Sequence, residues 1–481
     1  MPTYTVTVKW GKEQFPDIEV NTDEDPMLFK AQLFALTGVR PDRQKVMCKG
    51  VALKDTDWGK MPIKNGATIL LMGTKEELPE VPEIKTKFVE DMNERELATA
   101  LDLPSGLLNI GNTCYMNATV QCLKTVPELR SALKEFKGSI SLGSEQSMSA
   151  NITISLRDLY DTMDTGAPIP PIVLLQTFHM ALPRFAEKSD QGDYTQQDAN
   201  ECWTELIRML QQNLPATSGS TNKSIIDQYF GVTFDVEMKC TESESEEPTK
   251  SKENVLQLSC FISAEVKYLQ SGLKSKMHEE ISKFSFSLGR DATYTKNSLI
   301  SRLPAYLTVQ FVRFNYKYKV AINAKVLKDV KFPMDFDAFE LCTPELQERL
   351  TPMRLKFKEA EDSVLATNTS ENQEQSTKAD TTKLPFSFED DPGSNNSGYY
   401  TLQAVLTHQG RSSSSGHYVA WIRHKDDTWL KCDDEMVTTV TPSDIIKLSG
   451  GGDWHCAYVL LYGPRILEQP AVKETNQSDE K

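Results

Sequence analysis

The chain has 481 residues, more than one compact core usually holds, so two or three folded units are expected. The charged fraction of 25% and the hydrophobic fraction of 39% are ordinary for a globular protein, and no apolar run reaches the roughly 20 residues of a membrane-spanning helix. A net charge of −15 argues against a nucleic-acid binder, because phosphate binding needs clustered lysine and arginine. An integral membrane protein is likewise not expected.

No export signal is expected at the N-terminus. Residues 1–8 alternate like a strand and lack the basic start and the apolar block of a secretory signal. The nine cysteines are odd in number and scattered, which fits a reducing compartment where thiols stay unpaired. We therefore expect a cytoplasmic protein, with the nucleus as a second location.

Residues 1–73 are predicted to form a small mixed α/β unit. It opens with an alternating hairpin, and a helix is predicted to start at Asp25-Pro26 and to stop at Gly38. Two short β runs, at 45–48 and 68–72, close the unit. The apolar face of the helix is expected to contain Leu28, Ala31, Leu33 and Leu36.

This order of hairpin, helix and further strands resembles ubiquitin, and residues 38–45 and 49–55 strengthen the likeness. Ubiquitin ends in a cleavable diglycine, whereas here the chain continues through residues 72–77 into a longer protein. The resemblance therefore implies a built-in ubiquitin-like β-grasp domain that serves for docking, not a conjugated tag.

The rest of the chain divides by composition. A solvated linker rich in Glu, Pro and Lys is predicted at 74–103, and a large domain at 104–464. Within that domain, residues 241–254 and 359–396 lose apolar periodicity and are expected to be mobile surface insertions. A polar tail is expected at 465–481.

Residues 106–118 contain the candidate nucleophile. A turn rich in Gly and Asn runs into a helix-compatible stretch, which Asn112 or Thr113 can cap. Cys114 would then lie in the first turn, where exposed N–H groups and the positive end of the helix dipole favour a thiolate. A lone cysteine at a helix start is more often a small buried residue than a nucleophile. The assignment of Cys114 as the nucleophile therefore depends on the residues around it.

His417 is the candidate base among six histidines, because a loop of Ser and Gly delivers it to the start of a strand. If Arg423 faces Trp429 in the hairpin that follows, His417 lies diagonal to Asp433, within reach of a hydrogen bond. A slip of one residue in register would bring Asp434 to that place instead. Spacing alone leaves both aspartates open.

Together these segments resemble the ubiquitin-specific proteases. Residues 106–118 are similar to the family's cysteine box, and Gly416-His417-Tyr418-Val419 with residues 429–434 is similar to its histidine box. Further similar segments are 196–203, 303–314 and 451–462, so the likeness covers about residues 104–464.

The resemblance implies an α+β protein in which a papain-like catalytic domain of fingers, palm and thumb follows the ubiquitin-like domain. It implies a cysteine protease that cleaves after the C-terminus of ubiquitin, with ubiquitin and polyubiquitinated proteins as partners. Cys114 would attack, His417 would accept and return the proton, Asp433 would orient the imidazole, and Asn109 would help to hold the oxyanion.

The family's zinc site is expected to be absent. Many relatives hold a structural zinc with two Cys-x-x-Cys pairs, whereas this chain has only the single Cys240 and Cys260 in that region. We therefore predict neither a metal nor another cofactor.

An N-terminal ubiquitin-like unit joined to this catalytic domain resembles the proteasome-associated members of the family. The resemblance therefore implies docking on the regulatory particle of the 26S proteasome, trimming of ubiquitin chains there, and a monomer of low activity when free. It also implies two surface loops over the cleft, at about 315–322 and 412–416. The alternative is a largely non-catalytic regulator that binds ubiquitin and the proteasome.

Overall fold

The computed structural model describes residues 3–74, 103–140, 145–164, 167–317, 322–368, 381–412, 415–425, 427–452 and 454–470. The chain forms two compact units, Met1–Asp91 and Met92–Lys481, and each is described by itself. The predicted linker lies almost wholly outside the described residues, as do the tips of both predicted cleft loops, at 318–321 and 413–414.

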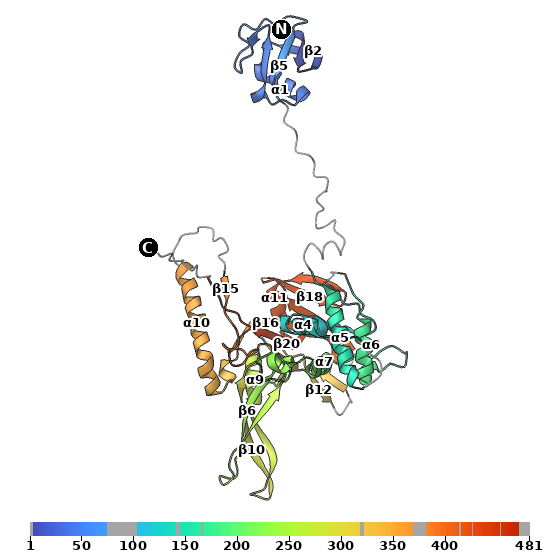
Figure 1. Ribbon diagram of the computed structural model, residues 1–481, viewed down its shortest axis with the longest axis vertical. Coiled ribbons are helices and arrows are strands. Elements are labelled where there is room, and N and C mark those ends of the chain that lie inside the picture. Colours follow the sequence, from blue (N-terminus) through green and yellow to red (C-terminus); the bar gives the residue numbers. More distant parts are fainter. Residues whose placement is uncertain are drawn as a thin grey trace, which may run out of the picture. The chain divides into compact units, whose positions relative to one another are not determined.

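The N-terminal unit is one mixed sheet with a helix across it, drawn in blue in Figure 1. The sheet order is β2-β1-β5-β3-β4, and β1 and β5 at its centre run parallel. Asp25 accepts a hydrogen bond from the backbone N–H of Met27 at the helix start, and Gly38 ends the helix in a left-handed conformation at φ 71°. The predicted helix limits are thus confirmed. The elements are β1 (Thr3–Trp10), β2 (Glu13–Asn21), α1 (Pro26–Thr37), β3 (Lys45–Cys48), β4 (Val51–Ala52) and β5 (Thr68–Met72).

The buried face of α1 differs from the predicted one. Leu33 is buried as expected, but Leu28 and Leu36 are 58% and 45% exposed. Phe29 joins Leu33 in the core, since two residues four positions apart lie one above the other on a helix. Lys30, a residue that apolar periodicity cannot place in a core, is buried on this face because its ammonium pairs with Asp55.

The second unit packs a group of helices against a large twisted sheet (Figure 1). The main path of the sheet is β19-β18-β17-β16-β20-β11-β8. Helix α3 is buried along its whole length and contacts β17. The helices are α3 (Cys114–Lys124), α4 (Pro127–Glu135), α5 (Glu145–Met163), α6 (Ile172–Ala181), α7 (Ala199–Asn213), α8 (Ile225–Phe230), α9 (Leu269–Met277), α10 (Pro344–Asn368) and α11 (Pro442–Ile446). The strands of this sheet are β8 (Leu258–Phe261), β11 (Leu307–Val312), β12 (Phe314–Lys317), β13 (Ile322–Lys325), β14 (Asp335–Asp337), β16 (Tyr399–Ser412), β17 (Ser415–Arg423), β18 (Trp429–Asp433), β19 (Met436–Val440) and β20 (Cys456–Pro464).

A second sheet, β7-β6-β10-β9, projects from this unit as a long ribbon (Figure 1). Its strands are β6 (Val232–Cys240), β7 (Thr249–Val255), β9 (His278–Ser285) and β10 (Arg290–Arg302). The expectation of an irregular insertion at 241–254 is therefore wrong from Thr249 onward. Because the side chains of β7 are exposed apart from the half-buried Val255, the strand carries no apolar alternation for sequence reasoning to detect.

Two further segments are more ordered than expected. Of the predicted insertion at 359–396, the first part continues α10 to Asn368, and Ser394 and Asn395 are buried near its end. In the predicted polar tail, β21 (Glu468–Pro470) pairs with β15 (Thr381–Lys383). Residues 369–380 and 471–481 lie outside the described part.

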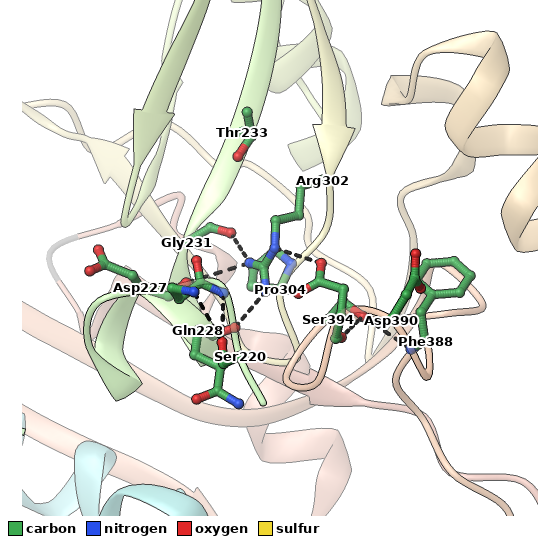
Figure 2. A network of polar contacts seen from close by, with 12 residues as sticks. Ser220, Asp227, Gln228, Gly231, Thr233, Arg302, Pro304, Phe388, Asp390 and Ser394 are labelled. Atoms are coloured by element: carbon green, nitrogen blue, oxygen red, sulfur yellow. Dashed lines mark hydrogen bonds and ion pairs between the residues drawn. The ribbon is translucent and has the colours of Figure 1, made fainter. Parts of the chain in front are cut away.

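Arg302 ties the base of the projecting sheet to the rest of the unit. Its guanidinium donates to both carboxylate oxygens of Asp391, at 2.8 and 2.9 Å. It also donates to the carbonyl of Gly231 at 2.6 Å and to that of Gln228 at 2.8 Å, at the end of α8. Figure 2 shows Arg302 between this helix end and the loop that carries Ser394. A cation is favourable there because helix C-termini present unpaired carbonyls.

All nine cysteines lie in the described residues, and each is a buried free thiol. Across the described ranges, none of the helices combines the length and the apolar character needed to span a membrane.

Candidate active site

The β17–β18 hairpin sets the relation between the predicted base and its carboxylate. Arg423 faces Trp429, as the hairpin prediction assumed. In this register His417 Nε2 lies 2.6 Å from Asp433 Oδ1. The alternative left open by spacing is thereby closed, since Asp433, and not Asp434, contacts the imidazole.

The charges of this pair stabilise one another. Hydrogen bonds to Asp433 and then to Cys114 raise the pKa of His417 from 6.5 to about 10. The hydrogen bond from His417 lowers the pKa of Asp433 well below its usual 3.8, and Lys431 lowers it further. Lys431 Nζ binds the second oxygen, Oδ2, at 2.7 Å. The imidazolium and the carboxylate are therefore both favoured near neutral pH.

Cys114 is the first residue of α3 and is only 2% exposed. It contributes a hydrogen bond to His417, and because Nε2 is taken by Asp433, Nδ1 is the ring nitrogen left for the sulfur. Thr113 occupies the N-cap position, but its side chain does not cap the helix. Asn109 does part of this work instead, because its Oδ1 accepts from the N–H groups of Gly111 and Thr113.

Asp434 has a role that the sequence did not reveal. Its two carboxylate oxygens accept from Asn109 Nδ2 at 2.9 Å and from Asn117 Nδ2 at 2.8 Å. Its backbone carbonyl accepts from Leu107 N–H at 2.9 Å, and its φ of 51° is left-handed. The strand that carries Asp433 is thus fastened to the turn before Cys114. The adjacent acidic pair was a visible signal, but nothing in the sequence showed which aspartate faces which partner.

The position of Asn109 suits an oxyanion-binding amide. Its Nδ2 group carries two N–H bonds, and Asp434 takes one of them. Among the described residues no acceptor takes the other. Because Asn109 is exposed, its remaining N–H is open to an acceptor such as a substrate oxyanion.

Helix α7 begins within the family-like segment 196–203 and contacts α3, the helix that starts at Cys114. Asp198 caps α7 through the N–H groups of Asn200 and Glu201. Tyr458 of β20 donates to both of its oxygens, at 2.9 and 2.8 Å. Burial raises the pKa of Asp198 above its usual value. This carboxylate therefore joins α7 to strand β20 of the sheet.

Comparison with known proteins agrees with this geometry. The sequence profile described as "Ubiquitin carboxyl-terminal hydrolase" matches residues 105–462. The chain belongs to the ubiquitin carboxyl-terminal hydrolase family. This hydrolase is 41% identical to Ubiquitin carboxyl-terminal hydrolase 7 of Arabidopsis thaliana, over 96% of this chain and 99% of the relative. It is 41% identical to Ubiquitin carboxyl-terminal hydrolase 14 of Caenorhabditis elegans, over 96% and 94%.

A solved structure shares the fold of this hydrolase. It is the SAGA Ubp8/Sgf11/Sus1/Sgf73 DUB module bound to ubiquitin aldehyde, with a TM-score of 0.51 and 20% identity over 75% of this chain and 69% of that one. The predicted fold class, a ubiquitin-like domain followed by a papain-like protease domain, is confirmed. The chain is an enzyme, a thiol-dependent ubiquitinyl hydrolase.

The two cysteines of the zinc prediction lie apart from any ligand cluster. Cys240 packs with Ala292 and Tyr294, whereas Cys260 belongs to a different core cluster, the one that contains Val309. Within the described ranges no three His, Cys, Asp or Glu side chains gather closely enough to hold a metal ion.

Proposed function

We propose that this hydrolase removes ubiquitin from conjugates at the proteasome, on which residues 1–73 dock, and that Cys114, His417, Asp433 and Asn109 carry the reaction. The observation that supports these roles most strongly is the contact of His417 with Asp433 beside the buried start of α3. It supplies a nucleophile, a base and an orienting carboxylate in one place.

The reaction follows from this arrangement. The proton of Cys114 passes to His417 Nδ1, which gives the imidazolium that the raised pKa of His417 favours, and Sγ then attacks the carbonyl carbon of the last ubiquitin residue. The oxyanion that forms is held by the free N–H of Asn109 and by N–H groups of the first turn of α3. The imidazolium returns its proton to the leaving amine, and a thioester remains. Water, deprotonated by His417, then hydrolyses the thioester and releases ubiquitin and Cys114.

Docking through residues 1–73 is supported by the architecture of the N-terminal unit. This unit has its own core and presents apolar side chains on its surface, among them Leu28, Leu36 and Met72. The curated relatives align over both units and not only over the protease domain. Proteasome docking also places the enzyme in the cytoplasm and nucleus, where we propose that it acts.

Two measurements on the full chain test this proposal. Ubiquitin vinyl sulfone should label the wild type and leave Cys114→Ala unlabelled, and an unlabelled wild type would support the non-catalytic alternative. Hydrolysis of a ubiquitin C-terminal amide should then rise when purified 26S proteasome is added. A rate that stays the same, with no co-sedimentation, would remove the docking part of the proposal while leaving the catalytic part intact.

A further inference from the structure

A cavity of about 410 Å³ lies away from the triad, between the helices and the sheet of the protease domain. Helices α3 and α4 contribute Lys124 and Arg130, and the residue after α5 is Asp164. From the sheet come Gln403 of β16 and Arg423 at the end of β17, and His424 follows Arg423 in the wall.

The cavity concentrates positive charge in a strongly acidic protein. Lys124 is buried, and its ammonium lies 3.0 Å from Asp164. Arg130 lies 2.9 Å from the other oxygen of the same carboxylate. Among the described residues, the ion-pair partner of Arg423 is the highly exposed Asp427, at 3.3 Å, which is not part of the wall. The lining therefore holds three cations and one carboxylate, which Lys124 and Arg130 share, and its net charge is +2 in a chain whose total is −15.

One donor in the cavity wall is unsatisfied. Arg130 donates through Nη2 to Asp164, but its buried Nε has no hydrogen-bond partner within the described structure. Buried polar groups are rarely left unpaired, and an arginine offers its N–H bonds as a fork that fits two oxygens of one anion. Burial also lowers the pKa of Lys124, a change that a bound anion would oppose.

The position of the cavity ties it to the catalytic elements. Helix α3 begins at Cys114 and ends at Lys124, and β17 runs from beside His417 to Arg423. The cavity thus lies at the far ends of the two elements that carry the sulfur and the imidazole. An anion bound there would contact both and hold the helices to the sheet.

We propose that this cavity is a binding site for a phosphate-bearing anion, held by Arg130, Arg423 and Lys124. A phosphate group carries up to two negative charges at neutral pH, which match the net charge of the wall, and its oxygens accept from both arginines. The same chemistry is present in a small polyphosphate and in a phosphorylated side chain of a partner protein. The experiment separates these two sources.

The test is calorimetric titration of the full chain with sodium tripolyphosphate and, separately, with a short alanine peptide that contains one phosphoserine. At least one should bind saturably with one site per chain and raise the melting temperature. Arg130→Gln combined with Arg423→Gln should weaken binding by roughly tenfold or more, since both forks are lost. Which probe binds more tightly identifies the source.

A matched control removes two arginines elsewhere. Arg184 and Arg208 are about half exposed and both pair with Glu205, so Arg184→Gln with Arg208→Gln should leave the affinity unchanged. If the cavity variant does not fold, Arg423→Gln alone provides the test, because Arg423 has only an exposed partner. No saturable binding of either probe, or equal weakening in the control, would refute the site. Neither result bears on the hydrolase reaction, since no ubiquitin is present.

Discussion

Arg302 and His417 each form the centre of a polar network in the protease domain, and each is paired with an aspartate. The guanidinium of Arg302 uses its donors on both oxygens of Asp391 and on backbone carbonyls, among them that of Gly231. His417 uses one ring nitrogen on Asp433 and keeps the other for Cys114. The first network is saturated and can only hold elements together. The second keeps one nitrogen for the sulfur, so a proton can be moved.

This difference predicts that breaking the His417 network costs activity more than stability. Asp433→Asn should lower kcat/KM for a ubiquitin C-terminal amide by about 10³-fold or more, because a carboxamide no longer stabilises the imidazolium or selects its tautomer. The free energy of unfolding should change by no more than about 1 kcal/mol, since both side chains are about one-third exposed. Activity within tenfold of wild type would contradict the assigned role.

Breaking the Arg302 network should have the reverse effect. Arg302→Met leaves Asp391 and the α8 carbonyls unpaired and should lower the free energy of unfolding by about 2–4 kcal/mol. The cost is less than for a wholly buried pair, because Arg302 and Asp391 keep 16% and 22% exposure. Urea titrations measure this loss. The kcat of the folded protein, measured without urea, should stay near that of wild type.

The control for Arg302 is an arginine of α10 whose partner lies next to Asp391. Arg349 pairs with Asp390, the neighbour of Asp391, but both side chains of that pair are largely exposed. Arg349→Met should therefore cost only about 0–1 kcal/mol. Equal losses in the two variants would mean that the network of Arg302 is not what stabilises the base of the projecting sheet.

Asp434 is intermediate between the two networks, and its loss should lower both the free energy of unfolding and kcat. Asp434→Ala removes the acceptor of two amide groups, Asn109 and Asn117, and should cost about 1–3 kcal/mol in unfolding free energy. It should also lower kcat by about 10- to 100-fold, because Asn109 loses its orientation. Asp444→Ala, at an exposed helix start, is the control with little effect on kcat. A kcat for Asp434→Ala equal to that of wild type would show that Asn109 holds its place without this carboxylate.

The smallest effect concerns the pH dependence of the His417–Asp433 pair. The raised pKa of His417 adds stability that is complete below 6.5 and is lost as the pH rises through about 10. The lowered pKa of Asp433 adds stability that is present above 3.8 and is lost as the pH falls through its folded value. The difference in unfolding free energy between wild type and Asp433→Asn should therefore be largest between about pH 3.8 and pH 6.5, where both contributions are present, and should shrink toward about pH 10. A difference that does not vary with pH would contradict the coupling.

Local features were predictable from sequence. The limits of α1 follow from Asp25-Pro26 and Gly38, because capping and left-handed backbone depend on neighbouring residues. The pairing of Arg423 with Trp429 follows from a short turn, which restricts the register of a hairpin. Strand β7 escaped prediction because its side chains are mostly exposed, and the buried face of α1 was misjudged because Lys30 enters the core with an ion-pair partner.

The sequence by itself determined the candidate catalytic residues and the short hairpin that brings His417 to Asp433, which are separated by 16 positions. Only the tertiary structure decided that Asp434 binds Asn109, 325 positions away, and that Arg130 and Arg423 line one cavity. The physical reason is the range of the forces involved. Turn geometry and strand alternation act between neighbours along the chain, whereas a carboxylate or an arginine chooses its partners only after packing has brought distant segments together.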